Sequence, residues 1–347
     1  MLVTGGGRGI GRMVGRLHRH HHATDATAHA AHIAHGVDTD AEQPRRSPLL
    51  LKEREKERER DPTFPPPPPP PRQIAEGFVA NGSTVYISSR DKAALDATAE
   101  ELTASAAAAA SATGGGPIGR CIAIEGNLGS RAGCEALAAA VEEAEPGGLH
   151  VLVNNSGASW GESIERQSGK LNWGWDKVLD LNVKAPFYLT RALLPSLRRA
   201  ATPDDPGRVV MIGSVVGVTP QDFPTHAYDS SKAALHSLTR KLAFELGPPV
   251  GGCGYGGEGE GEGEGRITVN AIAPGYVPTR MSSGLAAWGA DETTTSDASP
   301  LGRMGQSSDM AGAAIFLASP AGSWVTGVIL PVDGGILTQP IKIGGEG

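Results

Sequence analysis

The sequence predicts an α/β fold built on a doubly wound, mostly parallel sheet, and two observations carry that prediction. Short apolar runs without polar alternation recur at 84–88, 121–124, 150–153, 208–212, 267–272 and 328–332. Such runs are typical of strands buried on both faces. Amphipathic helical patterns separate them, as right-handed crossovers between parallel strands require. We therefore expect ligand-binding residues beyond the carboxyl ends of the strands.

Composition excludes several classes of protein. The 347 residues carry a formal net charge of −7, which gives no electrostatic case for nucleic acid or an anionic membrane as partner. No apolar run approaches the roughly 18 residues of a membrane span, and no signal peptide is evident. Cys121, Cys134 and Cys253 form no C-x-x-C pair and suit a reducing compartment. We expect a cytoplasmic protein, with an organellar address left open because the first strand looks truncated.

A glycine-rich turn, VTGGGRGIG at residues 3–11, follows the first strand. Its glycines allow a tight turn and a close approach of the backbone to a pyrophosphate, as in a Rossmann fold. The second strand should end roughly 20 residues beyond such glycines. Here it ends near Ser89, much farther along the chain. The expected cofactor contacts in this turn are Gly5, Arg8, Gly9, Ile10 and Gly11.

The intervening segment, residues 14–73, accounts for the extra distance. It holds seven of the ten histidines, a charge run and a proline block, a composition that favours disorder. Without it, residues 1–13 and 74–340 read as one continuous domain. The residues that then fall on one apolar helix face are Ile10, Met13, Ile74, Gly77 and Phe78. We therefore predict that the insertion splits the first helix.

Three interpretations of the insertion are open. Its ends can be written with intron boundaries, because Val14 codons begin GT and the proline block can form a pyrimidine tract before CAG. We favour a retained intron. The alternatives are an inert insert and a natural insert that binds metal through HRHHH or is recognised as polyproline. A second biased segment, the Gly/Glu-rich residues 248–265, is predicted to be a solvated loop.

Reactive side chains follow the later strands. Tyr228 and Lys232 lie four residues apart, on one face of a helix, where the ammonium is expected to lower the phenol pKa and make it a usable acid. Ser214, after the strand at 208–212, offers a hydroxyl to a substrate carbonyl. Asn182 lies within an apolar helical pattern and needs a polar partner there.

Three further turns follow strands and are candidates for cofactor contact. They are EGNLGS, NNSG and NAIAPGYVPT. The residues selected from them are Asn127, Leu128, Asn154, Gly157, Pro274, Gly275, Val277 and Thr279.

Taken in this order, these motifs resemble the short-chain dehydrogenase/reductase family across residues 1–13 and 74–340. The resemblance implies that Ser214, Tyr228 and Lys232 are catalytic and that Asn182 holds a proton-relay water. Tyr228 would protonate the alkoxide as hydride leaves the nicotinamide, and Lys232 would also hold the nicotinamide ribose. Two positions depart from the family pattern: Asn127 replaces its usual acidic residue, and Ser156 its usual alanine.

The residues after the second strand favour NADPH as cofactor. A carboxylate there would accept from the 2′-hydroxyl of NAD and repel a 2′-phosphate. Ser89 and Arg90 occupy the place instead, and Arg8 adds a second guanidinium. Asp91 is interpreted as a helix N-cap. NADPH in turn favours reduction over oxidation.

A closer resemblance comes from NNSGASWGESIE, GWDKVLDLNV and the stretch from LGRMGQ to VDGG. These are similar to 3-oxoacyl-acyl-carrier-protein reductases of the rhamnolipid-biosynthesis type, which implies a 3-oxoacyl thioester as substrate. Residues 276–290 would then form a mobile lid over the acyl chain. The expected substrate contacts are Ser214, Trp160, Met281, Leu285 and Trp288; the apolar ones could instead only pack.

Two alternatives to this function stay open. One is a carbonyl reductase of secondary metabolism, which the same catalytic residues would serve. The other is a catalytically dead scaffold whose insertion recruits partners. Because family members usually pair through the helices here at 172–199 and 226–247, the resemblance also implies a homodimer or homotetramer.

Overall fold

A parallel sheet forms the centre of the computed structural model, which describes residues 1–4, 72–112, 118–165, 173–202, 204–247, 265–279 and 292–339. Within these residues seven strands lie in the order β3-β2-β1-β4-β5-β6-β7, and every neighbouring pair is parallel. They are β1 (Leu2–Thr4), β2 (Thr84–Ser89), β3 (Arg120–Glu125), β4 (Val151–Asn154), β5 (Gly207–Ile212), β6 (Ile267–Pro274) and β7 (Ile329–Val332). The predicted doubly wound sheet is confirmed.

The strand order reverses at β1, which pairs with β2 on one side and β4 on the other. Thr4 ends β1, and its Oγ1 donates to the carbonyl oxygen of Val153 at 3.3 Å. Oγ1 of Thr4 also accepts from the backbone N–H of Asn155, at 3.3 Å. The chain diverges to opposite faces of the sheet here, which is where ligands of doubly wound sheets bind.

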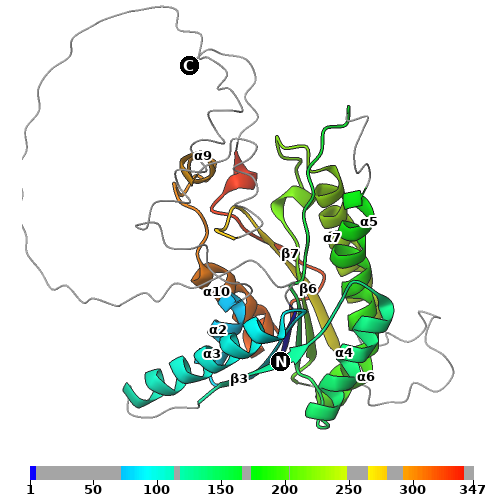
Figure 1. The fold of residues 1–347 in the computed structure, drawn as a ribbon, viewed down its shortest axis with the longest axis vertical. Coiled ribbons are helices and arrows are strands. Elements are labelled where there is room, and N and C mark those ends of the chain that lie inside the picture. The colour runs from blue at the N-terminus through cyan, green and yellow to red at the C-terminus, as the bar shows by residue number, and fades with distance from the viewer. Residues whose placement is uncertain are drawn as a thin grey trace, which may run out of the picture. The chain divides into compact units, whose positions relative to one another are not determined.

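Two helical layers cover the sheet (Figure 1). One contains α2 (Arg72–Ala80), α3 (Lys92–Ala112) and α10 (Ser307–Ala318), and the other contains α4 (Arg131–Ala144), α5 (Trp173–Leu179), α6 (Ala185–Ala200) and α7 (His226–Leu246). Successive strand residues point to opposite faces. Val3 therefore packs in the core cluster under the first layer, and Leu2 in the cluster under the second.

Helix α2 is the second half of the helix that the insertion was predicted to split. Ile74 and Phe78 are buried, as expected for its apolar face. Gly77 faces α10, where an added Cβ would lie 2.7 Å from the Cβ of Ala311. The helix ends as predicted at Asn81-Gly82, and Gly82 has a φ of 84°. Ile10 and Met13 of the predicted first half lie outside the described residues.

Short elements complete the described chain. Between α5 and α6 the helix passes through a π-helical turn, η1 (Asp180–Lys184), so the predicted helix at 172–199 is observed with an interruption. The remaining elements are η2 (Val215–Gly217), α9 (Glu292–Asp297), η4 (Pro320–Gly322) and η5 (Ile336–Thr338). None of the helices searched in the described part is long and apolar enough to cross a membrane.

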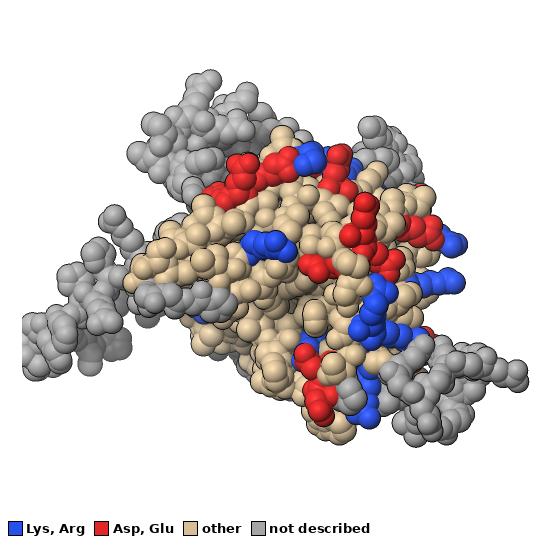
Figure 2. Space-filling view, turned by 90° about the horizontal axis from the view of Figure 1, so that it is seen from below, with Lys and Arg blue, Asp and Glu red and all other residues tan. Residues whose placement is uncertain are grey.

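The surface seen from below in Figure 2 mixes acidic and basic side chains. Among the described residues, exposed charges form ion pairs one helical turn apart, as Lys92 does with Asp96 and Arg131 with Glu135, both at 2.7 Å. Pairs this exposed contribute little to stability. On this face the charges form no extended basic surface of the kind that binds nucleic acid.

Candidate active site

Ser214 stands just beyond the carboxyl end of β5. It is the N-cap of η2, and its Oγ accepts from the backbone N–H of Val216 at 3.4 Å. Its side chain is also hydrogen-bonded to that of Tyr228. A buried apolar strand followed by a capped turn therefore holds this hydroxyl beside the phenol.

Tyr228 and Lys232 lie one turn apart near the start of α7. Lys232 is 4% exposed, and its Nζ donates to the carbonyl oxygen of Ile212 at 2.7 Å. The same Nζ lies 5.5 Å from the centroid of the Tyr228 ring. Because Ile212 is the last residue of β5, the lysine ties the helix that carries Tyr228 to the strand that leads to Ser214.

The pKa of Tyr228 moves in the direction opposite to the one predicted from the sequence. Burial raises the pKa of Tyr228 to about 12, against a lowering by its hydrogen bond to Ser214, and the charge of Asp229 raises it further. Burial also lowers the pKa of Lys232 to about 8. Loss of hydration therefore outweighs the hydrogen bond to Ser214, and the phenol keeps its proton at neutral pH.

Asn182 lies in the π-helical turn η1 and is 1% exposed. Its Oδ1 accepts from the backbone N–H of Ala158 at 2.8 Å, and its Nδ2 donates to the carbonyl oxygen of Ala158 at 2.9 Å. Nδ2 also donates to Oγ of Ser231 at 2.9 Å. Both amide hydrogens are thus engaged, so a relay water held by this residue would have to donate to one of its oxygens.

The predicted cofactor residues after β2 differ in exposure. Ser89 is buried, and its Oγ accepts from the backbone N–H of Asp91 at 3.3 Å. Asp91 accepts from the N–H of Ala94 at 3.1 Å through Oδ1, which confirms its interpretation as an N-cap. Arg90, between them, is exposed. A guanidinium is therefore presented to solvent just beyond the end of β2.

The turns after β3 and β4 each place one side chain in the protein interior. Asn127 is exposed, whereas Leu128 is 7% exposed and packs into the core. Nδ2 of Asn154 donates to Oγ1 of Thr190 at 3.2 Å, inside the protein. Gly157 is partly buried. The side chain of Asn127 is therefore accessible to solvent, whereas that of Asn154 is enclosed, and both residues stay predicted cofactor contacts.

The turn after β6 crosses closely over the end of β7. The N–H of Gly275, which follows Pro274, donates to the carbonyl oxygen of Val332 at 3.1 Å. A Cβ at Gly275 would lie 2.9 Å from Cα of Asp333, so only glycine fits this crossing. Val277 is buried and Thr279 partly buried.

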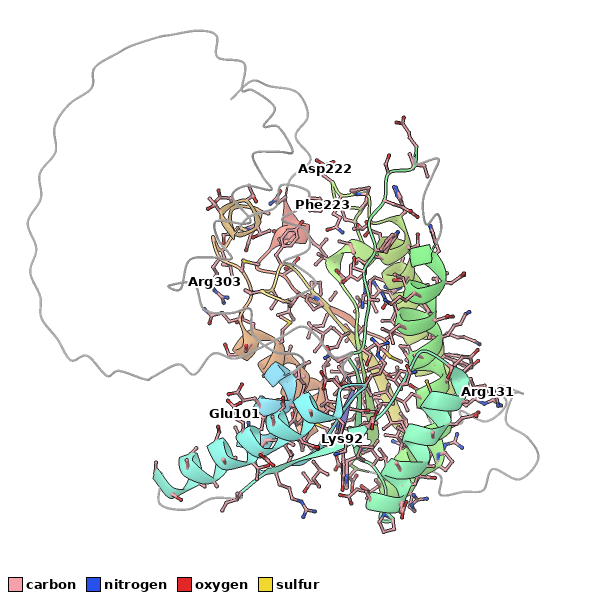
Figure 3. The ribbon with its side chains drawn as sticks, viewed as in Figure 1. Lys92, Glu101, Arg131, Asp222, Phe223 and Arg303 are labelled. Carbon is pink, nitrogen blue, oxygen red and sulfur yellow. The ribbon has the colours of Figure 1, made fainter. Side chains whose placement is uncertain are left out.

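Trp160 is partly buried, and its ring lies against Gly174 of α5, where an added Cβ would overlap it. Figure 3 shows Asp222 and Phe223 at the outer end of the loop that precedes α7. That loop is joined to the loop of Trp160 by a hydrogen bond from Glu162 N to Pro224 O at 2.9 Å. The predicted residues outside the described chain are Gly5, Arg8, Gly9, Ile10, Gly11, Met281, Leu285 and Trp288.

Sequence reasoning assigned no role to His236, one turn beyond Lys232 on α7. It is 2% exposed and fills the space beside Gly213 and Gly217, the glycines that flank Ser214 and η2. Two glycines four residues apart opposite a helical histidine are a signal that only the fold makes visible. No group of three or more His, Cys, Asp or Glu residues suited to a metal occurs among the residues searched in the described part.

The sequence of this chain is similar to those of known proteins. A family model described as short chain dehydrogenase matches residues 71–290, and one described as Enoyl-(Acyl carrier protein) reductase matches 261–337. The rhamnolipids biosynthesis 3-oxoacyl-[acyl-carrier-protein] reductase of Pseudomonas aeruginosa is 39% identical, over 76% of this chain and 90% of that protein. Galactitol 2-dehydrogenase (L-tagatose-forming) of Cereibacter sphaeroides is 36% identical, over 76% and 89%.

Among solved structures, the Pseudomonas aeruginosa RhlG/NADP active-site complex superposes with a TM-score of 0.63. The two sequences are 39% identical, and the match covers 76% of this chain and 91% of that one. The resemblance stated from the sequence motifs is confirmed at the level of both sequence and fold. This chain belongs to the short-chain dehydrogenase family of oxidoreductases.

Proposed function

We propose that this chain is an NADPH-dependent ketoreductase whose substrate is a 3-oxoacyl thioester and whose proton donor is Tyr228. The observation that carries the proposal is the meeting of Ser214, Tyr228 and Lys232 beyond the carboxyl end of β5. The thioester is supported by the name of the 39% identical Pseudomonas aeruginosa reductase. Asn182, joined to the same helix, completes the set of catalytic residues.

The protonation state of Tyr228 suits a reduction. A phenol with a pKa of about 12 holds its proton at neutral pH, beside the hydroxyl of Ser214. A substrate carbonyl oxygen placed between the two hydroxyls could accept from both, which favours negative charge at that oxygen. The nicotinamide, when bound, supplies the hydride to the carbonyl carbon. Tyr228 then gives its proton to the oxygen, and the ammonium of Lys232 stabilises the resulting phenolate.

The described residues fit a dinucleotide. An ammonium has three donors, and within the described chain Lys232 makes one hydrogen bond, to Ile212. Its other two donors suit the hydroxyls of a ribose. Arg90, exposed beyond β2, suits a 2′-phosphate, and the NADP complex of the RhlG structure supports this choice. The glycine turn at 5–11 would hold the pyrophosphate.

The domain boundaries are part of the proposal. Residues 1–13 and 74–340 form the catalytic domain, residues 14–73 are an insertion in its first helix, and residues 248–265 are a solvated loop. The enzyme works in the cytoplasm as a homodimer or homotetramer. Fluorescence titration of NADPH against the full chain and a chain without 14–73 tests the proposed domain boundaries. Binding by neither would support the scaffold alternative.

A substrate panel tests the activity. The purified full chain is mixed with NADPH and an acetoacetyl thioester, a simple aliphatic ketone or L-tagatose, and nicotinamide absorbance is followed. L-Tagatose is included because the Cereibacter relative is named for forming it. We expect the highest kcat/KM with the thioester, and with NADPH rather than NADH. Faster turnover of either other substrate would replace the thioester, and no turnover of any ketone would overturn the proposal.

A further inference from the structure

Ser231 lies between Tyr228 and Lys232 on α7, and its surroundings differ from those of the adjacent serine. Ser231 is 0% exposed, whereas Ser230 is exposed. A buried hydroxyl needs hydrogen-bond partners. The identity of those partners separates Ser231 from an ordinary helical serine.

The hydroxyl of Ser231 has a defined orientation. It lies 2.7 Å from the carbonyl oxygen of Tyr228, which can only accept, so Ser231 donates its proton there. It lies 2.9 Å from Nδ2 of Asn182, which can only donate, so Ser231 accepts from it. One hydroxyl therefore connects the side chain of Asn182 to the backbone of Tyr228.

The connection continues to the loop after β4. Asn182 makes two hydrogen bonds to the backbone of Ala158, at 2.8 and 2.9 Å. A buried series of hydrogen bonds thus runs from Ala158 through Asn182 and Ser231 to Tyr228. It joins three segments that are far apart in the sequence, and each amide hydrogen of Asn182 is used in it.

We infer that Ser231 is a positioning residue that fixes the first turn of α7, and with it the phenol of Tyr228, relative to Asn182. The inference rests on the proposed function, because it assigns Tyr228 a proton to deliver. Ser231 does not touch the reacting atoms. Its loss would leave a donor of Asn182 without a partner and remove the hydrogen-bonded connection between Asn182 and the first turn of α7. A misplaced acid slows the chemical step more than it weakens substrate binding.

The adjacent serine supplies a matched control. We expect Ser231→Ala to lower kcat at least about tenfold, with the KM for NADPH unchanged within about twofold. Ser230→Ala should leave kcat within about twofold of the parent, because its side chain is exposed. Ser231→Cys, with a weak donor and acceptor of similar size, should give an intermediate kcat. Circular dichroism of each full-length variant establishes that it is folded.

A double-mutant cycle separates positioning from general support of the fold. If Ser231 acts through Asn182, then adding Ser231→Ala to Asn182→Ala should lower kcat by less than about twofold. Full additivity, or a kcat for Ser231→Ala equal to that for Ser230→Ala, would overturn the inference while the parent activity upholds the proposed function. A parent chain with no ketoreductase activity would overturn both.

Discussion

The carboxyl edge of the sheet is built in two different ways on the two sides of β1, at β5 on one side and at β2 and β3 on the other. Near β5, the side chains of Ser214, Lys232 and Asn182 are 8%, 4% and 1% exposed, and each is hydrogen-bonded to another element. Near β2 and β3, Arg90 and Asn127 are exposed. Asn127 bonds only locally among the contacts described, to the N–H of Gly129 at 3.2 Å.

This difference is consistent with separate roles for the two regions, proton transfer near β5 and cofactor recognition near β2. In the proposed mechanism, the side chains that would move protons are held in place before any ligand binds, because misplacement by about 1 Å can cost about 10²-fold in rate. Groups that recognise a cofactor phosphate can stay hydrated until it binds. Substitutions near β5 should therefore change the rate and the stability strongly. Substitutions near β2 should change the affinity for the cofactor by smaller, salt-dependent amounts.

The largest effect is expected from Tyr228→Phe. Removing the phenolic hydroxyl removes the proposed proton donor and leaves the ring in place, so kcat should fall about 10²–10⁴-fold. NADPH binding, followed by fluorescence titration, should change little because the hydroxyl is not needed for it. A variant that retained more than a tenth of the parent kcat would show that another group donates the proton.

Lys232→Met should make the protein more stable and less active. Burial lowers the pKa of Lys232 from 10.5 to about 8, which costs the folded protein at most about 3 kcal/mol at pH 7. Methionine avoids this cost, so Tm should rise while kcat falls. Between pH 8 and 10.5 the unfolded chain keeps the proton that the folded chain has lost. The parent therefore gains stability with rising pH there, and the advantage of the variant should shrink.

Lys241→Met is the matched control for this comparison. Lys241 lies on the same helix, and its exposed ammonium pairs with Glu245 at 2.7 Å. An exposed pair of this kind contributes about 0–1 kcal/mol, so little change in Tm is expected. An equal rise in Tm for both variants would mean that burial of Lys232 is not the cause.

His236→Gln should alter stability in acid. Burial first, and then the charges of Lys232 and Arg240, lower the pKa of His236 from 6.5 to about 4. As the pH falls through this window the unfolded chain binds a proton that the folded chain does not. Between pH 6.5 and 4.5, the free energy of unfolding of the parent should fall by about 2 kcal/mol more than that of the glutamine variant.

Chemical denaturation at a series of pH values measures that difference directly. His150→Gln is the control, because His150 is exposed. Carboxylates also titrate in this range, but their contribution is common to parent and variants and cancels in the comparison. If the free energy of unfolding changes with pH in the same way for the parent and for His236→Gln, then the folded chain takes up the proton on His236 as readily as the unfolded chain, which would contradict the prediction.

The fold, and the placement of Tyr228 and Lys232 on one face of α7, could be predicted because their signals are local. The strand β4 contains the uninterrupted apolar run 151–153, and the spacing of Tyr228 and Lys232 places them on one helical face. The partners of Asn182 lie 24 and 49 residues away, so neither they nor its π-helical turn could be read from a local pattern. The direction of the Tyr228 pKa depends on burial, which spacing does not reveal.

The predicted cofactor contacts stay predictions, but the direction of their side chains could not be read from the sequence. Asn154 follows an apolar strand, as a cofactor residue should, yet its side chain bonds Thr190 inside the protein. Leu128 likewise belongs to the core. Which face of a turn receives a side chain depends on the packing of the neighbouring helix. That information lies in α4 and α6 and not in the turn itself.

The smallest expected effect is at Arg90. It tests most directly whether the residues near β2 and those near β5 have separate roles. Arg90→Ala removes an exposed guanidinium, so the KM for NADPH should rise about tenfold, while the KM for NADH and both kcat values stay within about twofold. Added salt should weaken NADPH binding to the parent more than to the variant, because exposed charges are screened. Arg131→Ala, an exposed arginine on α4 (Figure 3), should change neither KM. A fall in kcat for Arg90→Ala comparable to that for Tyr228→Phe would mean that cofactor recognition and proton transfer are coupled across the sheet.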